Sequence, residues 1–347
     1  MVGLDVGSSS VKAVELSVKG KSGDFELVHM GVAPLPPDAI VQGAFLNSSV
    51  IVETIREAID IARIKTKSVA AAVSGHSVIV KKVSLPSMTR DELDEQIRWE
   101  AEQYIPFDVN EVNLDFQILE SSGTDGQMDV LLVAAKKDLI DDYVQVINEA
   151  GLTPAAIDVA AFAVENAYEA NYPADPGEVV ALINIGAQVV NINITSNGVP
   201  LFTRDITTAG NQYTEEIQKT LSVGYEEAER LKLGSGSKDA STDVVPQEVE
   251  QAMQAINETV VGEIGRSLDF FAATTADSRI GRAYISGGGA NVSGFLTAFY
   301  ERTGIEVEMM NPLARMRPSS KFEPDLIDEL APSLSVGVGL ALRRVEF

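Results

Sequence analysis

The first residues of the chain place a carboxylate, a glycine, three serines and a lysine within eight positions. Apolar and polar residues alternate over residues 3–16 on both sides of Gly7, which is the pattern of two strands joined by a tight turn. Backbone N–H groups converge in such a turn and serine hydroxyls add donors, so phosphate oxygens could bind there. Asp5 could hold a hydrated cation, and Lys12 could add a positive charge. The candidate phosphate contacts are Gly7, Ser8, Ser9, Ser10 and Lys12.

Residues 182–194 repeat this arrangement. They comprise an apolar strand, a polar residue at Asn184, a glycine turn at Gly186 and a returning strand. A third glycine turn, at residues 287–289, follows another apolar run and precedes a helix. A single hairpin of this kind also occurs where nothing binds. Two of them with a late Gly-Gly-Gly turn predict a duplicated α/β fold that closes over one nucleotide.

The composition limits the class of protein. The 347 residues, 45% of them hydrophobic, are enough for two domains. The absence of cysteine excludes a disulfide scaffold, a thiolate metal site and a cysteine nucleophile. The net charge is −24, from 51 acidic and 27 basic residues, which disfavours a nucleic-acid-binding surface and direct adhesion to an anionic membrane. The sequence has no recognisable signal peptide and no apolar run of about 18 residues, so we expect a cytoplasmic protein without direct membrane insertion.

Residues 74–135 have a different character and predict an inserted subdomain. A strand that ends at Pro86 precedes a helix opened by the capping-box pair Thr89 and Glu92, and two more strands follow. We expect the first strand to lie at a sheet edge, where a peptide could add by β-pairing. Trp99 lies beside the apolar stripe of the helix, and we expect it to be partly buried rather than to stack on a ligand.

The rest of the chain supplies the remaining elements of the second half. Residues 173–178 contain two prolines and a glycine and mark the best domain boundary, and residues 234–246 are the most loop-like segment. Residues 248–275 have apolar positions at helical spacing and predict a long helix that faces the core. Small residues at Gly337 and Gly339 would allow the last helix to pack closely.

In this order, the segments resemble the actin-like ATPase superfamily, which includes actin, Hsp70 and the division protein FtsA. The resemblance implies a duplicated, ribonuclease H-like fold, with two domains around a nucleotide cleft and an inserted subdomain placed as in FtsA. The implied subdomains are 1A (residues 1–73 and 136–172), 1C (74–135), 2A (173–209 and 276–330), 2B (210–275) and a C-terminal helix (331–347) that returns to 1A.

The resemblance also implies ATP and Mg²⁺ as ligands. Both hairpins would bind phosphates, and Asp5 and Asn184 would hold Mg²⁺ through water. Asp158, at the start of the first connecting helix, would position the attacking water, but it could instead cap that helix. Glu229 and Lys232 would reach the adenosine, but they also have the spacing of an ordinary surface ion pair. The other implied nucleotide contacts are Gly186, Ala187, Gln188, Gly287, Gly288 and Gly289.

Within the superfamily, residues 3–16, 85–112 and 150–159 resemble the PilM family of type IV pilus assembly proteins. This implies a cytoplasmic ATP-binding adaptor, peripheral to the inner membrane, with a groove beside the inserted subdomain for the N-terminal cytoplasmic peptide of the membrane protein PilN. The adaptor would link the membrane proteins to the pilus motor ATPases and platform protein, and could form a homo-oligomer or ring. The alternatives are a self-assembling FtsA-like division or cytoskeletal ATPase and a small-molecule kinase.

Asn184 departs from the superfamily pattern, which usually has aspartate at this position. A neutral amide is a poorer ligand for a hard cation than a carboxylate. We therefore expect the chain to bind Mg-ATP but to hydrolyse it slowly or not at all.

Overall fold

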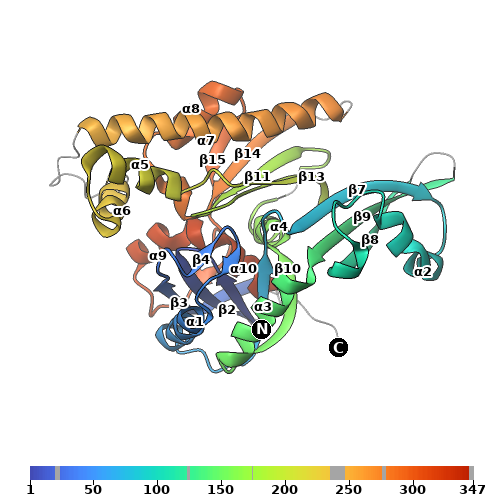
Figure 1. Cartoon of the computed structure of the whole chain (residues 1–347), viewed down its shortest axis with the longest axis horizontal. Helices are drawn as coiled ribbons and strands as arrows, with labels where there is room; N and C mark the ends of the chain where they lie inside the picture. Colours follow the sequence, from blue (N-terminus) through green and yellow to red (C-terminus); the bar gives the residue numbers. More distant parts are fainter. Residues whose placement is uncertain (20–23, 123–125, 174, 235–246, 276–278, 344–347) are drawn as a thin grey trace.

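The computed structural model describes residues 1–19, 24–122, 126–173, 175–234, 247–275 and 279–343. Two main sheets, one in each half of the chain, lie one above the other, and a smaller sheet extends from their side (Figure 1). Most of the predicted loop at 234–246 falls outside the described residues. Among the described helices, none is long and apolar enough to cross a membrane.

The first half is built on a six-stranded sheet in the order β10-β6-β1-β2-β3-β16. Its strands are β1 (Val2–Val6), β2 (Ser10–Lys19), β3 (Asp24–Pro34), β6 (Ser68–Val73), β10 (Thr153–Val159) and β16 (Arg317–Pro318). Helices α1 (Ser48–Ala62) and α3 (Lys137–Glu149) pack on one face through an apolar core. A short hairpin, β4 (Ile40–Val41) and β5 (Ala44–Phe45), precedes α1.

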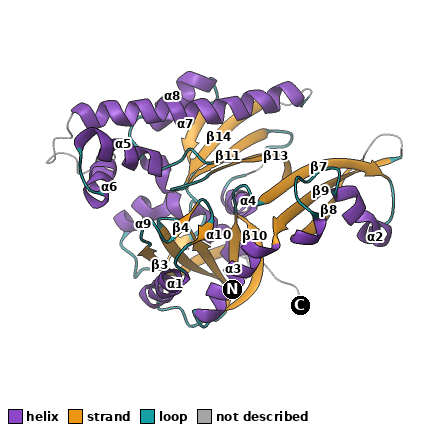
Figure 2. Ribbon diagram, in the orientation of Figure 1, coloured by secondary structure: helices purple, strands orange, loops and turns teal. Residues whose placement is uncertain are grey.

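The second half has a five-stranded sheet in the order β13-β12-β11-β14-β15. Its strands are β11 (Val179–Ile185), β12 (Val190–Ser196), β13 (Val199–Ile206), β14 (Ile280–Ser286) and β15 (Glu306–Met309). The long helix α7 (Gln247–Thr274) and α8 (Phe295–Thr303) cover its outer face (Figure 2). Helices α5 (Asn211–Leu221) and α6 (Tyr225–Gly234) follow β13 and pack beside α7.

The two main sheets share one topology. In the first sheet, β1 pairs antiparallel with β2 and parallel with β6. In the second sheet, β11 pairs antiparallel with β12 and parallel with β14 in the same way. The outer strands also correspond, since β3 and β13 extend the antiparallel side while β10 and β15 extend the parallel side. The predicted duplication is therefore confirmed.

A third apolar cluster lies between the halves. It contains inward-facing residues of both sheets, such as Ala72 and Leu182, together with α4 (Ala160–Asn171), α9 (Pro324–Leu330) and α10 (Ser335–Leu342). Small residues permit the closest approach here, because a side chain on Gly3 of β1 would overlap the carbonyl of Gly337 in α10. The last helix thus lies directly against the strand that leads into the first hairpin.

Residues 78–136 form a separate three-stranded sheet in the order β7-β9-β8 with its own core. Its elements are β7 (Val78–Pro86), α2 (Arg90–Ala101), a 3-10 turn (Val109–Glu111), β8 (Val112–Ser122) and β9 (Gln127–Lys136). The capping box of Thr89 and Glu92 is present, and β7 lies at a sheet edge as predicted. The expectation of a partly buried Trp99 is wrong. The residue is 74% exposed, because the buried stripe of α2 runs through Leu93 and Ile97 on the other side.

Candidate functional site

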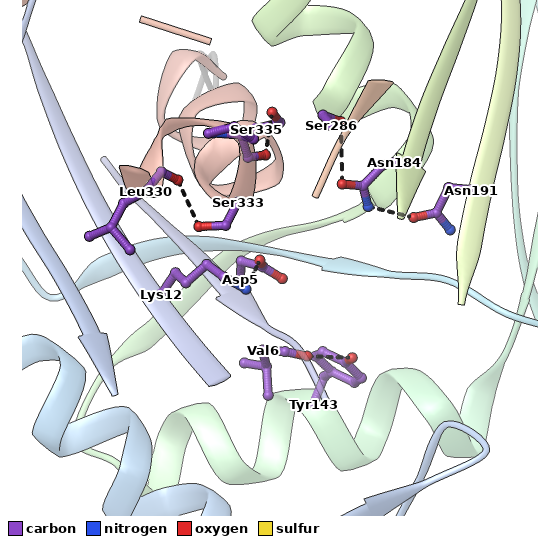
Figure 3. Close-up of polar contacts among 11 residues, drawn as sticks. Asp5, Val6, Lys12, Tyr143, Asn184, Asn191, Ser286, Leu330, Ser333 and Ser335 are labelled. Atoms are coloured by element: carbon purple, nitrogen blue, oxygen red, sulfur yellow. Dashed lines mark hydrogen bonds and ion pairs between the residues drawn. The ribbon is translucent and has the colours of Figure 1, made fainter. Parts of the chain in front are cut away.

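The first hairpin joins β1 to β2 through residues 7–10. The N–H of Gly7 donates to the carbonyl of Ser10 at 3.1 Å, and Asp5 lies directly opposite Lys12 in the strand pair. The Lys12 ammonium contacts the Asp5 carboxylate at 3.0 Å (Figure 3), and both side chains are less than one-fifth exposed. The predicted carboxylate and cation therefore meet as an ion pair beside the turn.

Gly7 keeps the concave side of this turn open. A Cβ on Gly7 would lie 3.1 Å from the carbonyl oxygen of Ser10, 3.5 Å from Lys12 Nζ and 3.9 Å from Asp5 Oδ1. The space beside both charged groups is thus one that any other residue would fill. The carbonyl of Ser9 accepts a hydrogen bond from the N–H of Leu35 at 2.9 Å, which fixes the turn to the end of β3.

The second hairpin has the same geometry with different side chains. The N–H of Gly186 donates to the carbonyl of Val189 at 2.9 Å, and Asn184 lies opposite Asn191. Asn184 Nδ2 donates to Asn191 Oδ1 at 3.0 Å, and Ser286 Oγ lies 3.4 Å from Asn184 Oδ1 (Figure 3). A hydrogen-bonded amide pair thus occupies the place that an ion pair has in the first hairpin.

Gln188, in the second turn, connects the two halves. Its amide nitrogen donates to the carbonyl of Ile40 at 2.6 Å, and its amide oxygen accepts from the N–H of Gln42 at 2.9 Å. Both partners belong to the β4–β5 hairpin. The predicted phosphate contact is therefore held by main-chain groups of the other half. Next to it, the carbonyl of Ala187 accepts a hydrogen bond from the N–H of Asn211, at the start of α5.

The Gly-Gly-Gly turn follows β14 and packs against the end of β11. Gly287 has φ +89°, and a side chain there would overlap the carbonyl of Ile185. A Cβ on Gly289 would lie 2.6 Å from the Ile185 side chain, whereas Gly288 has open space around the corresponding position. The turn therefore approaches the second hairpin as closely as glycine allows.

Glu229 and Lys232 form an ion pair on α6, with 2.5 Å between Lys232 Nζ and Glu229 Oε1. Sequence reasoning missed their shared partner, Thr214 of α5. The Thr214 hydroxyl donates to Glu229 and accepts from Lys232, the latter at 2.9 Å. The two residues thus form an ion pair, but one that is largely buried and not at the surface, and the adenosine role stays a prediction.

Asp158 is buried at the end of β10, next to the start of α4. Its carboxylate accepts from the N–H of Val159 and pairs with Arg343, which follows α10. The capping alternative is wrong, because Val159 is the N-cap residue and no side chain caps the helix. Its role toward water stays a prediction, and its Arg343 partner had no signal in the local sequence.

Sequence reasoning also missed a set of buried polar residues between the halves. Asn191, Asn193 and Thr195 alternate along β12 and face the first half. Asn193 and Thr195 both donate to Glu165 of α4, while Asn191 donates to Asp205 of β13 at 2.8 Å. Burial raises the pKa of both carboxyl groups, although their hydrogen bonds oppose this shift. The Asn-x-Asn-x-Thr alternation in β12 was the available signal.

One buried acceptor near the second turn lacks a partner. Asn211 Oδ1 is the single buried side-chain oxygen or nitrogen in the described part of the chain without a hydrogen bond. Asn211 begins α5, and its N–H is already bonded to Ala187. A buried amide oxygen without a donor is unfavourable, so a ligand hydroxyl or water at this position would satisfy it.

The described residues include no group of three or more histidine or acidic side chains that could cage a metal ion. The hairpins supply two oxygen donors, Asp5 and Asn184, and Mg²⁺ commonly uses one or two protein oxygens and takes its other ligands from phosphates and water. The open space beside Gly7 has room for phosphate and its metal, and the unpartnered oxygen of Asn211 could accept a hydrogen bond from a nucleotide.

Comparison with protein families gives a match along almost the whole chain. The family model described as type IV pilus assembly protein PilM matches residues 3–345. Among curated proteins, the cell division protein FtsA of Bacillus subtilis is 24% identical over 269 residues, and FtsA of Neisseria meningitidis is 23% identical over 269 residues. These matches cover 70% and 71% of this chain but only 60% and 64% of the two relatives.

Solved structures show the same relationship. The PilM-PilN type IV pilus biogenesis complex contains a chain that superposes with a TM-score of 0.87 at 29% identity, covering 98% of this chain and 97% of that one. MreB 5 of Spiroplasma citri bound to AMPPNP superposes with a TM-score of 0.52 at 13% identity, covering 97% and 93%. These likenesses, with the shared sheet topology, confirm the predicted actin-like fold.

Proposed function

The chain belongs to the PilM family of type IV pilus assembly proteins, and we propose that it binds Mg-ATP between its halves and acts as an adaptor in pilus assembly. The observation that carries the nucleotide part is the pair of matched hairpins, which present Asp5 with Lys12 and Asn184 with Asn191 toward the region between the sheets. This arrangement of two glycine turns suits a chain of phosphates with a cation between them.

In this proposal the first hairpin binds the phosphates. The turn at residues 7–10 supplies N–H and hydroxyl donors, Lys12 neutralises phosphate charge, and Asp5 accepts from water in the Mg²⁺ shell. The turn at residues 186–188 closes on the opposite side. When bound, Mg²⁺ would neutralise phosphate charge. The Lys12–Asp5 contact keeps both charged groups beside the open face of Gly7 before nucleotide arrives.

The adenosine would lie toward the second half. The turn at residues 287–289, the Glu229–Lys232 pair and Asn211 provide the polar groups there, and the unpartnered Asn211 oxygen could accept a hydrogen bond from a ligand hydroxyl. We propose weak or absent hydrolysis, because Asn184 is neutral and Asp158 is paired with Arg343. Both carboxylate oxygens of Asp158 are already engaged, one by the N–H of Val159 and the other by Arg343, which leaves fewer lone pairs to orient water.

We further propose that the subdomain of residues 78–136 receives the N-terminal peptide of a PilN-type inner-membrane protein. Support comes from the complex that contains the structural neighbour and from β7, whose free edge can pair with an incoming strand. The chain would then lie in the cytoplasm, peripheral to the membrane, and link its partner to motor ATPases and the platform protein, as a single copy or as a ring. We also propose that the chain is divided into subdomains at the boundaries that the resemblance to the superfamily implies.

Calorimetric titration tests this proposal. The chain is titrated with ATP in the presence of Mg²⁺ or EDTA, and then with a synthetic N-terminal peptide of a PilN-type protein. We expect saturable ATP binding that Mg²⁺ strengthens, and one-to-one peptide binding. Peptide binding without ATP binding would refute the nucleotide part alone. ATP-dependent polymerisation without peptide binding would favour the FtsA-like alternative instead.

A further inference from the structure

One row of polar side chains crosses the second sheet. Ser286, Asn184, Asn191 and Asp205 occupy directly paired positions on β14, β11, β12 and β13. Each is joined to the next by a hydrogen bond, at 3.4, 3.0 and 2.8 Å. Asp205 then accepts the N–H of Gly75 at 2.5 Å, from the segment that connects β6 to the inserted subdomain. The row therefore starts beside the glycine turn and ends on the other half.

The chemistry of Asp205 sets the direction of every bond in this row. Burial raises the pKa of Asp205, but the hydrogen bonds from Asn191 and Gly75 favour its ionised form. An ionised carboxylate can only accept hydrogen bonds, so Asn191 must turn its Nδ2 toward it. The Oδ1 of Asn191 then faces Asn184, which must in turn present its own Nδ2. Asn184 is left with Oδ1 on the side of Ser286. Asn184 Oδ1 therefore accepts from Ser286 Oγ and keeps a second lone pair, so the end of the row beside the glycine turn presents an acceptor and not a donor.

We infer that Asp205 is a positioning residue that orients the Asn184 amide with its oxygen toward bound Mg²⁺ and its water. This inference rests on the proposed nucleotide site. An amide oxygen can ligate a hard cation or accept from its water, whereas an amide NH₂ group would repel the cation. Asp205 reaches neither metal nor nucleotide and acts through Asn191.

Gly75 fixes the direction of the hydrogen bonds along the row. Its main-chain N–H can only donate, and it takes the second oxygen of Asp205. In a D205N variant the new amide would have to give its oxygen to Gly75, because its NH₂ group would otherwise face that N–H. The NH₂ group would then face Asn191. Asn191 and Asn184 would both flip, and Asn184 would present its own NH₂ group on the side of Ser286.

The test measures ATP affinity with Mg²⁺ and with EDTA, and uses the ratio of the two. We expect D205N to lower this ratio about tenfold, the lower end of typical outer-shell effects, with affinity in EDTA unchanged. The double variant D205N/N191D should restore the ratio, because a carboxylate at 191 again accepts from both neighbours. A role in packing would not predict this rescue. The double variant also restores the negative charge that D205N removes, so an effect of overall charge is tested by a separate control, E165Q.

E165Q is the matched control. Glu165 is also a buried carboxylate that accepts from two side chains of β12, but its row does not include Asn184. We expect the Mg²⁺ ratio of E165Q to equal that of the wild type. An unchanged ratio in D205N, or an equal loss in E165Q, would overturn the inference.

A second measurement does not depend on ligand binding. In the nucleotide-free protein, NMR cross-relaxation should connect the Asn184 NH₂ protons to Asn191 in the wild type, and to Ser286 in D205N. If the wild type binds no ATP, the proposed function fails while this readout still decides the amide orientation. Asn184 NH₂ protons near Ser286 in the wild type would refute the inference directly.

Discussion

The hairpins β1–β2 and β11–β12 have the same backbone geometry, but the first carries a charged pair of side chains and the second a neutral pair. Each turn has four residues and begins with a glycine. In each hairpin, one polar pair lies one step back along the strands from the last residue pair before the turn. In the first hairpin the facing pair is Asp5 with Lys12, and in the second it is Asn184 with Asn191. Duplication has thus conserved the backbone while one copy kept formal charges and the other kept only amides.

The two polar pairs also differ in where their hydrogen-bond and ion-pair partners lie. The Asp5–Lys12 pair is complete within its own hairpin. The Asn184–Asn191 pair needs Ser286 on one side and Asp205 on the other, so its orientation depends on the rest of the sheet and on Gly75. The charged groups of the first hairpin need no other element to hold them, whereas the orientation of the amides in the second depends on neighbouring strands and Gly75.

Truncating the residue on the first strand of each hairpin, Asp5 or Asn184, should give the largest contrast. D5A leaves Lys12 partly buried without its partner and should lower the free energy of unfolding by about 2 to 3 kcal/mol. N184A loses a neutral pair and should cost about 1 kcal/mol. Urea denaturation followed by circular dichroism measures both. D269A, which breaks an exposed pair with Arg302, should stay within about 0.5 kcal/mol, and equal losses for D5A and N184A would contradict the contrast.

Replacing the first glycine of each turn by alanine should have a smaller effect on stability, and here the larger loss should fall on the second hairpin. A Cβ on Gly186 would lie 2.8 Å from the Val189 carbonyl oxygen, closer than the 3.1 Å at Gly7, so G186A should cost about 1 to 2 kcal/mol and G7A less. G7A instead fills the concavity beside Lys12 and should weaken ATP binding. Thermal melts and ATP titration of both variants separate the two effects. A stable G7A with unchanged ATP affinity would count against the first turn as the phosphate site.

The pH dependence should be the smallest effect and concerns the second sheet. Burial raises the pKa of Glu165 above its ordinary value of 4.5, so the folded state holds this proton more tightly than the unfolded state. The free energy of unfolding therefore falls as the pH rises from 4.5 through the raised folded value. E165Q should flatten this part of the profile, measured by denaturation between pH 4 and 8. An unchanged slope would show that Glu165 does not titrate there.

The sequence predicted the features that depend on local pattern. Gly7, Gly186 and Gly287 punctuate alternating strands, and the capping box of α2 lies within four residues, so turns and elements could be placed without tertiary information. Trp99 was misplaced because a single helical stripe does not say how wide the covered face is.

The partners of the site residues were not predictable in this way. Asp158 meets Arg343, Asn191 meets Asp205, and Gln188 meets the β4–β5 hairpin, all across long sequence separations. No local spacing encodes such contacts, because they arise only when strand pairing, the packing of α10 and the approach of the two halves bring these residues together. The sequence therefore proposed the site only as a list of residues, and the hydrogen-bond partners of those residues required the fold.

The contact between Gly3 and Gly337 has a consequence for how the molecule is made. Strand β1 is synthesised long before the helix that covers it, α10, which is the last of the described helices in chain order. The inner face of β1 and the cluster between the halves therefore lack their cover throughout most of synthesis. Contacts between residues so far apart in sequence form slowly, so we expect the packing of α10 on β1 to be a late step of folding.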